Sequence, residues 1–432
     1  MQIHVVKTGE TIESIASTYG MTAERLIQEN ELNNPSKLVV GQTIVILKPI
    51  KTYTVVEGDN LQTIATKNGV DRIQLLQNNP RLSEDTILYP GETIVIEYDT
   101  PKKRKVFING YAYPFINRQV LRKTLPYLTT LTIFTYGFTE EGALIPAEDE
   151  ELIAMAREYG VAPIMLLSTL TKDGNFSTAL ATAILNDIPK QEILINNIIA
   201  NMKAKGYVGF DADFEYLSAS DKDPYSEFLR RVTKRVQEEG GFVMTALAPK
   251  TYAEQPGLLY EGHDYKAIGE IVDKVLLMTY EWGYAFGPPM AVSPLNKVEE
   301  VLKYAVTVIP PAKLLMGVPN YCYDWTLPFV QGLSQAKAMG IVEATDQAAE
   351  VGTTIEFDTL QASPFYNYTR TVNGVAENHI VWFEDARSIR DKMLLGDKYN
   401  LNGIGVWQIM KYWPQLWLVV NSSYEIEKIV FS

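Results

Sequence analysis

Eight short runs of apolar and β-branched residues alternate with helix-like stretches through most of the chain. We expect strands near residues 106–111, 131–137, 162–168, 207–215, 242–248, 273–280, 313–319 and 403–408. Helix-like stretches between them include residues 148–159, 190–205 and 225–239. Strands that alternate with helices are typical of a parallel sheet with helices packed outside it. Eight such units predict an α/β fold, a (β/α)8 TIM barrel, over residues 106–432.

The longest gap between expected strands separates the seventh from the eighth. It contains two further strand-like segments, residues 353–357 and 379–383. We therefore expect a small α+β insertion in the barrel at about residues 326–385.

The residues before the barrel contain an internal repeat. Residues 5–20 read VVKTGETIESIASTYG, and residues 54–69 read TVVEGDNLQTIATKNG. The ends of the two units, 40–46 and 90–96, also match, at an offset of 50 residues. Each unit has a short strand, a glycine turn, two helices and a closing strand, which is a β-α-α-β pattern. In the second unit, Asp59 and Gln62 are expected to cap the first helix.

This repeated pattern resembles the LysM domain. The resemblance implies that the units bind glycans that contain N-acetylglucosamine, through the loops that flank the first strand and helix. We expect one such domain at residues 1–49 and a second at 50–99, and we interpret the polar, basic residues 100–105 as a linker. A purely structural pair of domains is the alternative.

The fourth expected strand carries three acidic residues in alternation, Asp211, Asp213 and Glu215. Alternate residues of a strand share a face, so these three side chains should point together into the barrel. Their mutual repulsion raises the pKa of at least one carboxyl group, as a general acid requires at neutral pH. Glu215 should lie at the carboxyl end of the barrel, where barrel enzymes carry out their chemistry. A solvated acidic strand edge is the alternative.

The D-x-D-x-E run resembles that of glycoside hydrolase family 18, the chitinase-like barrels. Val208 stands where the longer family motif has another Asp, so the start of the motif differs while its core is intact. Met278-Thr279-Tyr280 resembles the family's Met-x-Tyr at the sixth strand, and Trp407 resembles its eighth-strand tryptophan. In that family the acetamido group of the substrate is the nucleophile, and the configuration is retained.

The resemblance implies a role for each of five residues. Glu215 protonates the glycosidic oxygen and then acts as the base for water. Asp213 orients the acetamide N–H, and Asp211 holds or exchanges a proton with Asp213. Tyr280 donates a hydrogen bond to the acetamido oxygen, and Trp407 forms the floor under the distorted sugar.

Further candidate substrate contacts are Tyr111, Glu281, Trp282, Asp324 and Trp325. For the last two, loop packing is an equally good interpretation. Chitinases usually have Asp after the sixth-strand tyrosine, whereas this chain has Glu.

With two LysM-like units and no recognisable secretion signal, the chain resembles the spore cortex fragment-lytic N-acetylglucosaminidases of endospore-forming bacteria. The resemblance implies hydrolysis of β-1,4 bonds after N-acetylglucosamine in peptidoglycan fragments during germination. It also implies synthesis in the cytoplasm without a signal peptide and a final location in the outer layers of the spore. A chitinase and a non-catalytic glycan-binding coat protein are the alternatives.

Composition limits the other function classes. The formal net charge of −13 disfavours nucleic acid and anionic lipid as partners. A single cysteine, Cys322, excludes a disulfide framework within the chain, and three scattered histidines suggest no metal site. We expect no cofactor, no membrane partner and a monomer.

Overall fold

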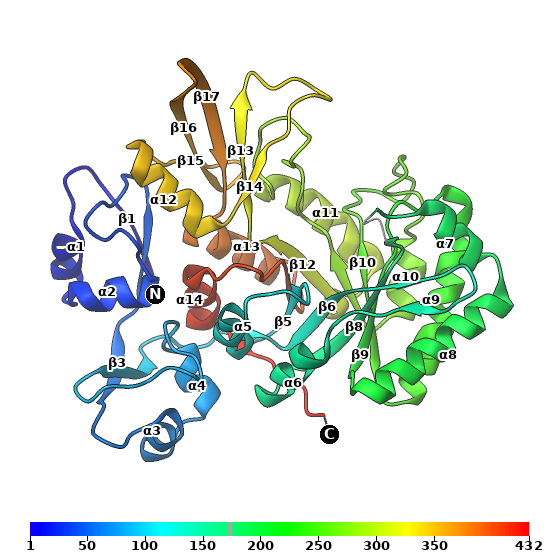
Figure 1. The fold of residues 1–432 in the computed structure, drawn as a ribbon, viewed down its shortest axis with the longest axis horizontal. Helices are drawn as coiled ribbons and strands as arrows, with labels where there is room; N and C mark the ends of the chain where they lie inside the picture. The colour runs from blue at the N-terminus through cyan, green and yellow to red at the C-terminus, as the bar shows by residue number, and fades with distance from the viewer. Residues whose placement is uncertain (172–174, 432) are drawn as a thin grey trace.

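The barrel expected from the alternating pattern is present. A computed structural model describes residues 1–171 and 175–431 (Figure 1). The parallel barrel strands are β5 (Lys105–Ala112), β6 (Thr130–Phe138), β8 (Ala162–Ser168), β9 (Gly209–Asp213), β10 (Phe242–Leu247), β11 (Lys274–Leu277), β12 (Leu314–Pro319) and β18 (Gly403–Trp407). They follow one another around the barrel in chain order, and pairing between β5 and β6 closes it. The predicted α/β barrel is therefore confirmed.

Helices cover the outside of the barrel. They are α5 (Arg118–Thr124), α6 (Glu150–Glu158), α7 (Thr178–Leu185), α8 (Ile188–Lys205), α9 (Lys222–Glu238), α10 (Tyr265–Ile271), α11 (Leu295–Val308), α13 (Ala386–Lys398) and α14 (Pro414–Ser423). The ends of α8 show why it forms where it does. Asp187 caps it by accepting a hydrogen bond from the Lys190 backbone N–H at 3.1 Å, and Gly206, with φ of 77°, ends it.

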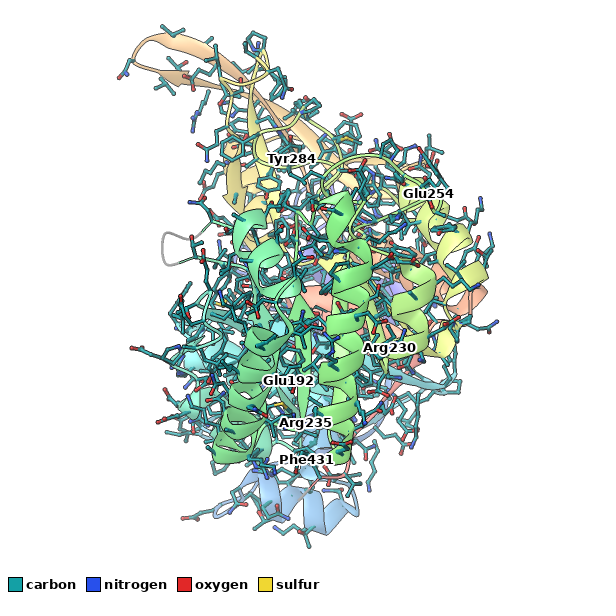
Figure 2. All side chains as sticks on the ribbon, turned by 90° about the vertical axis from the view of Figure 1, so that its right-hand side faces the viewer. Glu192, Arg230, Arg235, Glu254, Tyr284 and Phe431 are labelled. Carbon is teal, nitrogen blue, oxygen red and sulfur yellow. The ribbon has the colours of Figure 1, made fainter. Side chains whose placement is uncertain are left out.

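Helices α8 and α9 lie side by side on one flank of the barrel (Figure 2). Arg235 of α9 lies 3.6 Å from Glu192 of α8, at the solvent-facing side of this pair. Two short strands, β7 (Leu144–Ile145) and β19 (Glu425–Ile426), extend the barrel sheet next to β6 and β5. Within residues 1–171 and 175–431, no helix is both long enough and apolar enough to cross a membrane.

Two barrel strands are shorter than their sequence patterns predict. The run at 207–215 forms a strand only over Gly209–Asp213, and the run at 273–280 only over Lys274–Leu277. In both cases a residue in the left-handed region follows, Tyr216 with φ of 55° and Glu281 with φ of 64°. These turns lead the chain away from the sheet, so the last residues of each run lie on loops at the carboxyl end of the barrel.

The insertion between β12 and β18 is a five-stranded antiparallel sheet with one helix, and it projects from the barrel (Figure 1). Its strands are β13 (Cys322–Leu327), β14 (Lys337–Met339), β15 (Glu356–Asp358), β16 (Ser363–Val372) and β17 (Val375–Trp382), and its helix is α12 (Ile341–Val351). The sheet begins at Cys322, a few residues before the expected start of the insertion. One face packs on α12, where the Tyr366 hydroxyl donates to the Ala344 carbonyl at 2.9 Å.

The N-terminal repeat folds into two β-α-α-β modules, as the sequence predicts. The first module contains β1 (Gln2–Val5), α1 (Ile12–Tyr19), α2 (Ala23–Asn30) and β2 (Thr43–Ile46). The second module contains β3 (Pro49–Thr54), α3 (Leu61–Asn68), α4 (Arg72–Gln77) and β4 (Thr93–Tyr98). In each module the first and last strands pair in an antiparallel arrangement.

The predicted cap of α3 is wrong. Asn60, not Asp59, is the capping residue: its side chain accepts a hydrogen bond from the Thr63 backbone N–H at 2.9 Å, and the Thr63 hydroxyl accepts from the Asn60 backbone N–H. The Asp59 carboxylate instead accepts from the Val56 backbone N–H at 3.0 Å and forms an ion pair with Lys67 at 2.6 Å. The glycine turn before the helix uses the acid to close itself, so the next residue is left to cap.

Both modules pack directly on the barrel. The second module shares one continuous apolar core with the barrel helices, and the Tyr127 hydroxyl donates to the Gln77 carbonyl at 3.1 Å. The expected linker also lies against the barrel, because the Lys103 backbone N–H donates to the Ser423 carbonyl at 2.7 Å and Arg104 pairs with Asp397 at 3.0 Å. The modules are therefore held in place by the barrel.

Equivalent glycines of the two modules provide a matched test of this packing. Gly41 and Gly91 have nearly the same φ, 90° and 93°. A Cβ atom on Gly41 would lie 1.9 Å from the Ile355 carbonyl oxygen of the insertion, whereas a Cβ on Gly91 would meet nothing within 4 Å. Gly91→Ala should therefore lower the free energy of unfolding only by the left-handed backbone cost, about 1–2 kcal/mol. Gly41→Ala should lower it further, and equal unfolding midpoints for the two variants would contradict this account.

Candidate active site

The three acidic residues lie at the carboxyl end of the barrel on and just after β9. Phe210 and Phe214, which alternate with them, join the apolar core under the helices, and the Phe214 ring stacks on Phe138 and Phe228. This outward packing of the phenylalanines directs Asp211 and Asp213 into the barrel, where both are buried.

The barrel interior next to these acids is apolar. A separate cluster of buried side chains fills it, consisting of Phe107, Tyr111, Phe134, Leu166, Met244, Ala246, Leu276 and Leu315. The hydroxyl of Tyr111 donates a hydrogen bond to Asp211 Oδ2 at 3.0 Å. Burial raises the pKa of Asp211 to about 7, against the opposing effect of this hydrogen bond.

Asp213 lies between Asp211 and Glu215 along the chain. Burial raises the pKa of its carboxyl group well above the usual range, and the charges of Glu215 and Asp211 raise it further. Its Oδ1 atom is buried and has no hydrogen-bond partner in the described part of the chain. A carboxyl group in this state favours its protonated form and has an oxygen free for a substrate N–H.

Glu215 follows β9 and is partly exposed, so a bound molecule can reach it. Burial raises the pKa of its carboxyl group to about 7, and the charge of Glu281 adds to the effect. A glutamic acid with this pKa is about half protonated at pH 7, where one with the usual pKa of 4.5 has lost its proton. Glu215 can therefore carry a proton near neutral pH, as a general acid must.

Tyr280 comes from the loop after β11 and lies close to the backbone of β12. A Cβ atom on Gly317 would lie 2.7 Å from the Tyr280 ring, so the glycine allows the ring to lie there. The loop is fixed by the Ser293 hydroxyl, which donates to the Thr279 carbonyl at 2.7 Å. Burial, followed by the charges of Asp213 and Glu215, raises the pKa of Tyr280 well above its usual range, so its hydroxyl stays a donor.

Trp407 ends β18 and covers one side of the apolar barrel interior. Its ring makes edge contacts with Tyr111 and Phe134, at centroid distances of 5.8 Å and 5.1 Å. The indole is only partly buried. A tryptophan held by other rings and still open to solvent on one side suits a platform for a sugar ring.

Glu281 is held by the insertion, an arrangement that was not foreseen from the sequence. Its Oε1 atom accepts hydrogen bonds from the hydroxyls of Tyr321, at 3.1 Å, and Tyr323, at 3.2 Å. The one sequence signal for these two tyrosines is their period of two with Trp325, which begins just before β13 and continues along it. Trp282 packs partly buried on the main core, and its backbone N–H donates to the Val292 carbonyl at 3.1 Å.

Asp324 and Trp325 point to opposite faces of the inserted sheet. The Asp324 carboxylate is buried between the Tyr368 hydroxyl, at 2.6 Å, and His379 Nδ1, at 2.9 Å. The Trp325 ring is also buried, and its indole N–H donates to the Gly287 carbonyl at 2.9 Å. These environments favour packing over a sugar contact at both positions, which were open alternatives from the sequence.

Exposed aromatic side chains surround the same end of the barrel and were not predicted as site residues. They lie on the loops after β5, β9, β10 and β11 and are Phe115, Tyr216, Tyr252, Tyr284 and Phe286. Figure 2 shows Tyr284 at this end, beneath the projecting insertion. Exposed rings beside a group of buried acids suit the binding of sugar rings.

Comparisons with known proteins agree with this architecture. Residues 110–411 match the family described as "Glycosyl hydrolases family 18", and residues 4–47 and 53–97 each match the LysM domain. The "Cortical fragment-lytic enzyme" of Bacillus subtilis (strain 168) is 39% identical over 437 residues, which cover 100% of both chains.

Solved structures show the same likeness. The spore cortex-lytic enzyme SleL of Bacillus megaterium QM B1551 has a TM-score of 0.84 at 39% identity, covering 99% of each chain. A chitinase from Chromobacterium violaceum has a TM-score of 0.67 at 23% identity over 73% of this chain and 98% of its own, a likeness of fold alone.

The position of Glu281 leads to a test of the electrostatics. Glu281→Gln keeps a side-chain oxygen for Tyr321 and Tyr323 but removes the negative charge that raises the pKa of Glu215. The pKa of Glu215 should therefore fall below about 7, as measured by NMR titration of the ¹³C-labelled carboxyl carbon.

Glu254→Gln is the matched control for this titration. Glu254 is an exposed acid at the same end of the barrel (Figure 2), and it is not among the groups that shift the Glu215 pKa. The control should leave the titration of Glu215 unchanged. Equal changes in the Glu215 pKa in the two variants would mean that the loss of any nearby negative charge, and not of Glu281 in particular, lowers this pKa.

Proposed function

Because this chain belongs to glycosyl hydrolase family 18, we propose that it cleaves β-1,4 bonds after N-acetylglucosamine in peptidoglycan fragments of the spore cortex, with Glu215 as acid and base. That it is a glycoside hydrolase follows from the family. The proposed β-1,4 cleavage after N-acetylglucosamine and its mechanism are supported mainly by the following arrangement of side chains. A part-exposed glutamic acid with a pKa of about 7 follows two buried acids on one strand and shares the barrel end with Tyr280 and Trp407.

The first step of the proposed mechanism is proton transfer to the leaving group. Glu215 donates its proton to the glycosidic oxygen while the carbonyl oxygen of the substrate's own acetamido group attacks the anomeric carbon. The bond between the anomeric carbon and the glycosidic oxygen breaks, and a cyclic oxazolinium forms. Glu215 is left as a carboxylate.

The buried acids and Tyr280 act on the acetamido group during this step. Asp213 accepts a hydrogen bond from the acetamide N–H and stabilises the positive charge that develops on the ring. Its proton moves toward Asp211, whose carboxyl group has a raised pKa of about 7 and can hold it. The Tyr280 hydroxyl donates to the acetamido oxygen and aligns it with the anomeric carbon, above Trp407.

Water completes the reaction. The Glu215 carboxylate takes a proton from a water molecule, which attacks the anomeric carbon from the side that the leaving group left. The oxazolinium opens, and the product has the β configuration of the substrate. Glu215 recovers its proton for the next cycle.

The relatives support the cortex as the source of the substrate. The chain covers the full length of a Bacillus subtilis protein named "Cortical fragment-lytic enzyme", at 39% identity. Two LysM matches support binding to a polymer of N-acetylglucosamine. We propose the outer layers of the spore as the place of action on the same grounds.

The experiment that tests this function compares the unaltered chain with Glu215→Gln by mass spectrometry of products from cortex-derived muropeptides. The unaltered chain should release products that end in N-acetylglucosamine. The variant keeps the shape but cannot donate an acidic proton, so turnover should fall by about 10²–10⁴-fold. Cleavage of chitin oligomers without cleavage of cortex fragments would identify a chitinase instead. If the protein cleaves neither substrate but still binds the glycan, it is a glycan-binding protein and not a hydrolase.

The pH dependence of kcat/KM gives an independent test. Burial raises the pKa of Glu215 from the usual 4.5 to about 7, so the acid is fully protonated near pH 5 and loses its proton as the pH rises through about 7. Activity should fall across the same range. Asp211 titrates there too, so the midpoint belongs to the cluster and not to one residue. An alkaline limit below pH 5 or above pH 9 would contradict the assignment.

A further inference from the structure

The two LysM modules repeat the same chain segment in opposite environments. In the first module, residues 39–43 pack on the barrel, and Val39 and Thr43 are buried. The equivalent segment of the second module, residues 89–93, faces solvent, and Tyr89 is 61% exposed. The repeat thus provides an internal comparison between a covered and an open copy of one surface.

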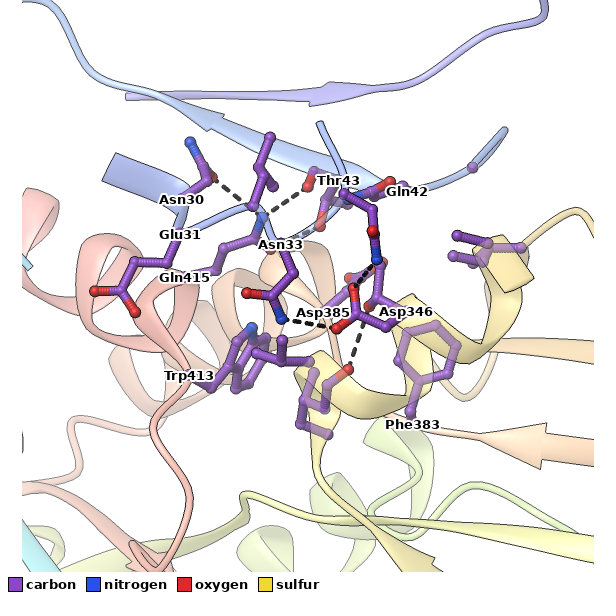
Figure 3. Close-up of a pocket in the computed structure, with 18 of the residues that line it drawn as sticks. Asn30, Glu31, Asn33, Gln42, Thr43, Asp346, Phe383, Asp385, Trp413 and Gln415 are labelled. Carbon is purple, nitrogen blue, oxygen red and sulfur yellow. Dashed lines mark hydrogen bonds between the residues drawn. The ribbon is translucent and has the colours of Figure 1, made fainter. Parts of the chain in front are cut away.

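Specific contacts cover the copy in the first module. The Ile355 backbone N–H of the insertion donates to the Val40 carbonyl at 2.9 Å, and the Thr43 hydroxyl donates to Gln415 of α14 at 2.9 Å. The Asn33 amide donates to Asp346 of α12 at 2.7 Å. Figure 3 shows Asn33, Thr43 and Gln415 meeting across this contact. The edge of the first module is therefore already occupied by this chain's own barrel and insertion.

At matching positions, the first module has charged or buried residues where the second module has exposed apolar ones. The first module has Lys7 and Lys37 where the second has Val56 and Ile87, and its buried Val39 corresponds to Tyr89. Val56, Ile87 and Tyr89 are 50%, 71% and 61% exposed. The two segments that carry them are joined where the Gly91 backbone N–H donates to the Val55 carbonyl at 2.9 Å. The second module thus presents an uncharged apolar platform that the first lacks.

We propose that the second module alone binds the glycan polymer, on the platform of Val56, Ile87 and Tyr89, while the first module braces the insertion against the barrel. N-acetylglucosamine suits this platform because it is uncharged and the C–H faces of its ring pack on aromatic and aliphatic side chains. The identity of the polymer as peptidoglycan rests on the proposed function. The assignment of binding to one module does not.

Cosedimentation with insoluble peptidoglycan tests this assignment. All proteins are the full chain with Glu215→Gln, so that the polymer is not consumed. Ile87→Ala together with Tyr89→Ala should weaken binding at least 10-fold. The matched pair at equivalent positions of the first module, Lys7→Ala with Lys37→Ala, should stay within twofold of the parent. Thermal unfolding midpoints show that each variant is folded.

Two further measurements decide between occupants. Soluble N-acetylglucosamine oligomers should release the parent protein from the polymer. When the oligomers are added to the protein, its backbone amide NMR signals should shift at residues 55–60 and 86–92 and not at residues 7–11 and 36–42. Equal losses for the two pairs of variants, or shift changes in both modules, would overturn the division of roles. Release by a stem peptide and not by the oligomers would overturn the glycan as the occupant.

Hydrolysis is measured separately on soluble cortex fragments with the unmutated chain. Failure of that reaction overturns the proposed function and leaves the binding result standing. Failure of the parent protein to bind any N-acetylglucosamine polymer overturns this inference whatever the hydrolysis result.

Discussion

Placing carboxyl groups in an apolar environment without a counter-charge is costly, and most of this active site follows from that constraint. The two-residue period of β9 leaves Asp211 and Asp213 no direction except the barrel interior, because Phe210 and Phe214 are held in the outer core. No basic side chain pairs with either acid among the described residues. The least costly solution is to keep protons on the cluster, which is what raises the pKa of its members.

The loops that follow the strands place further functional side chains beside these buried acids. Tyr216 and Glu281 adopt left-handed backbone conformations three residues after β9 and four residues after β11, and the residues before them, Glu215 and Tyr280, lie on the loops beyond the ends of these strands. The position of Glu281 depends in turn on the start of the insertion, because the hydroxyls of Tyr321 and Tyr323 donate hydrogen bonds to its carboxylate. An element outside the barrel thus contributes to the electrostatics of the acid inside it.

Much of this arrangement could be predicted because it depends on local patterns. The repeat, the alternating acids and the eight apolar runs each rest on periodicity within one segment, and all three correspond to elements of the structure. The role of Asn60 as the cap could not be separated from that of Asp59, because both residue types cap helices and only the turn geometry decides. The support of Glu281 by Tyr321 depends on how the insertion meets the barrel, and the burial of Asp324 depends on pairing with Tyr368 and His379 within the insertion. Both are contacts between distant segments, which no local pattern encodes.

The short segment between the modules and the barrel has a consequence for how this enzyme meets a long polymer. With Lys103 bound to the Ser423 carbonyl and Arg104 paired with Asp397, the chain has no free tether that could let the catalytic end search around an anchored module. A glycan strand held at one point is instead presented to the barrel at a set distance and direction. The distance between the LysM modules and the barrel is therefore fixed by packing contacts and not by the length of a flexible segment.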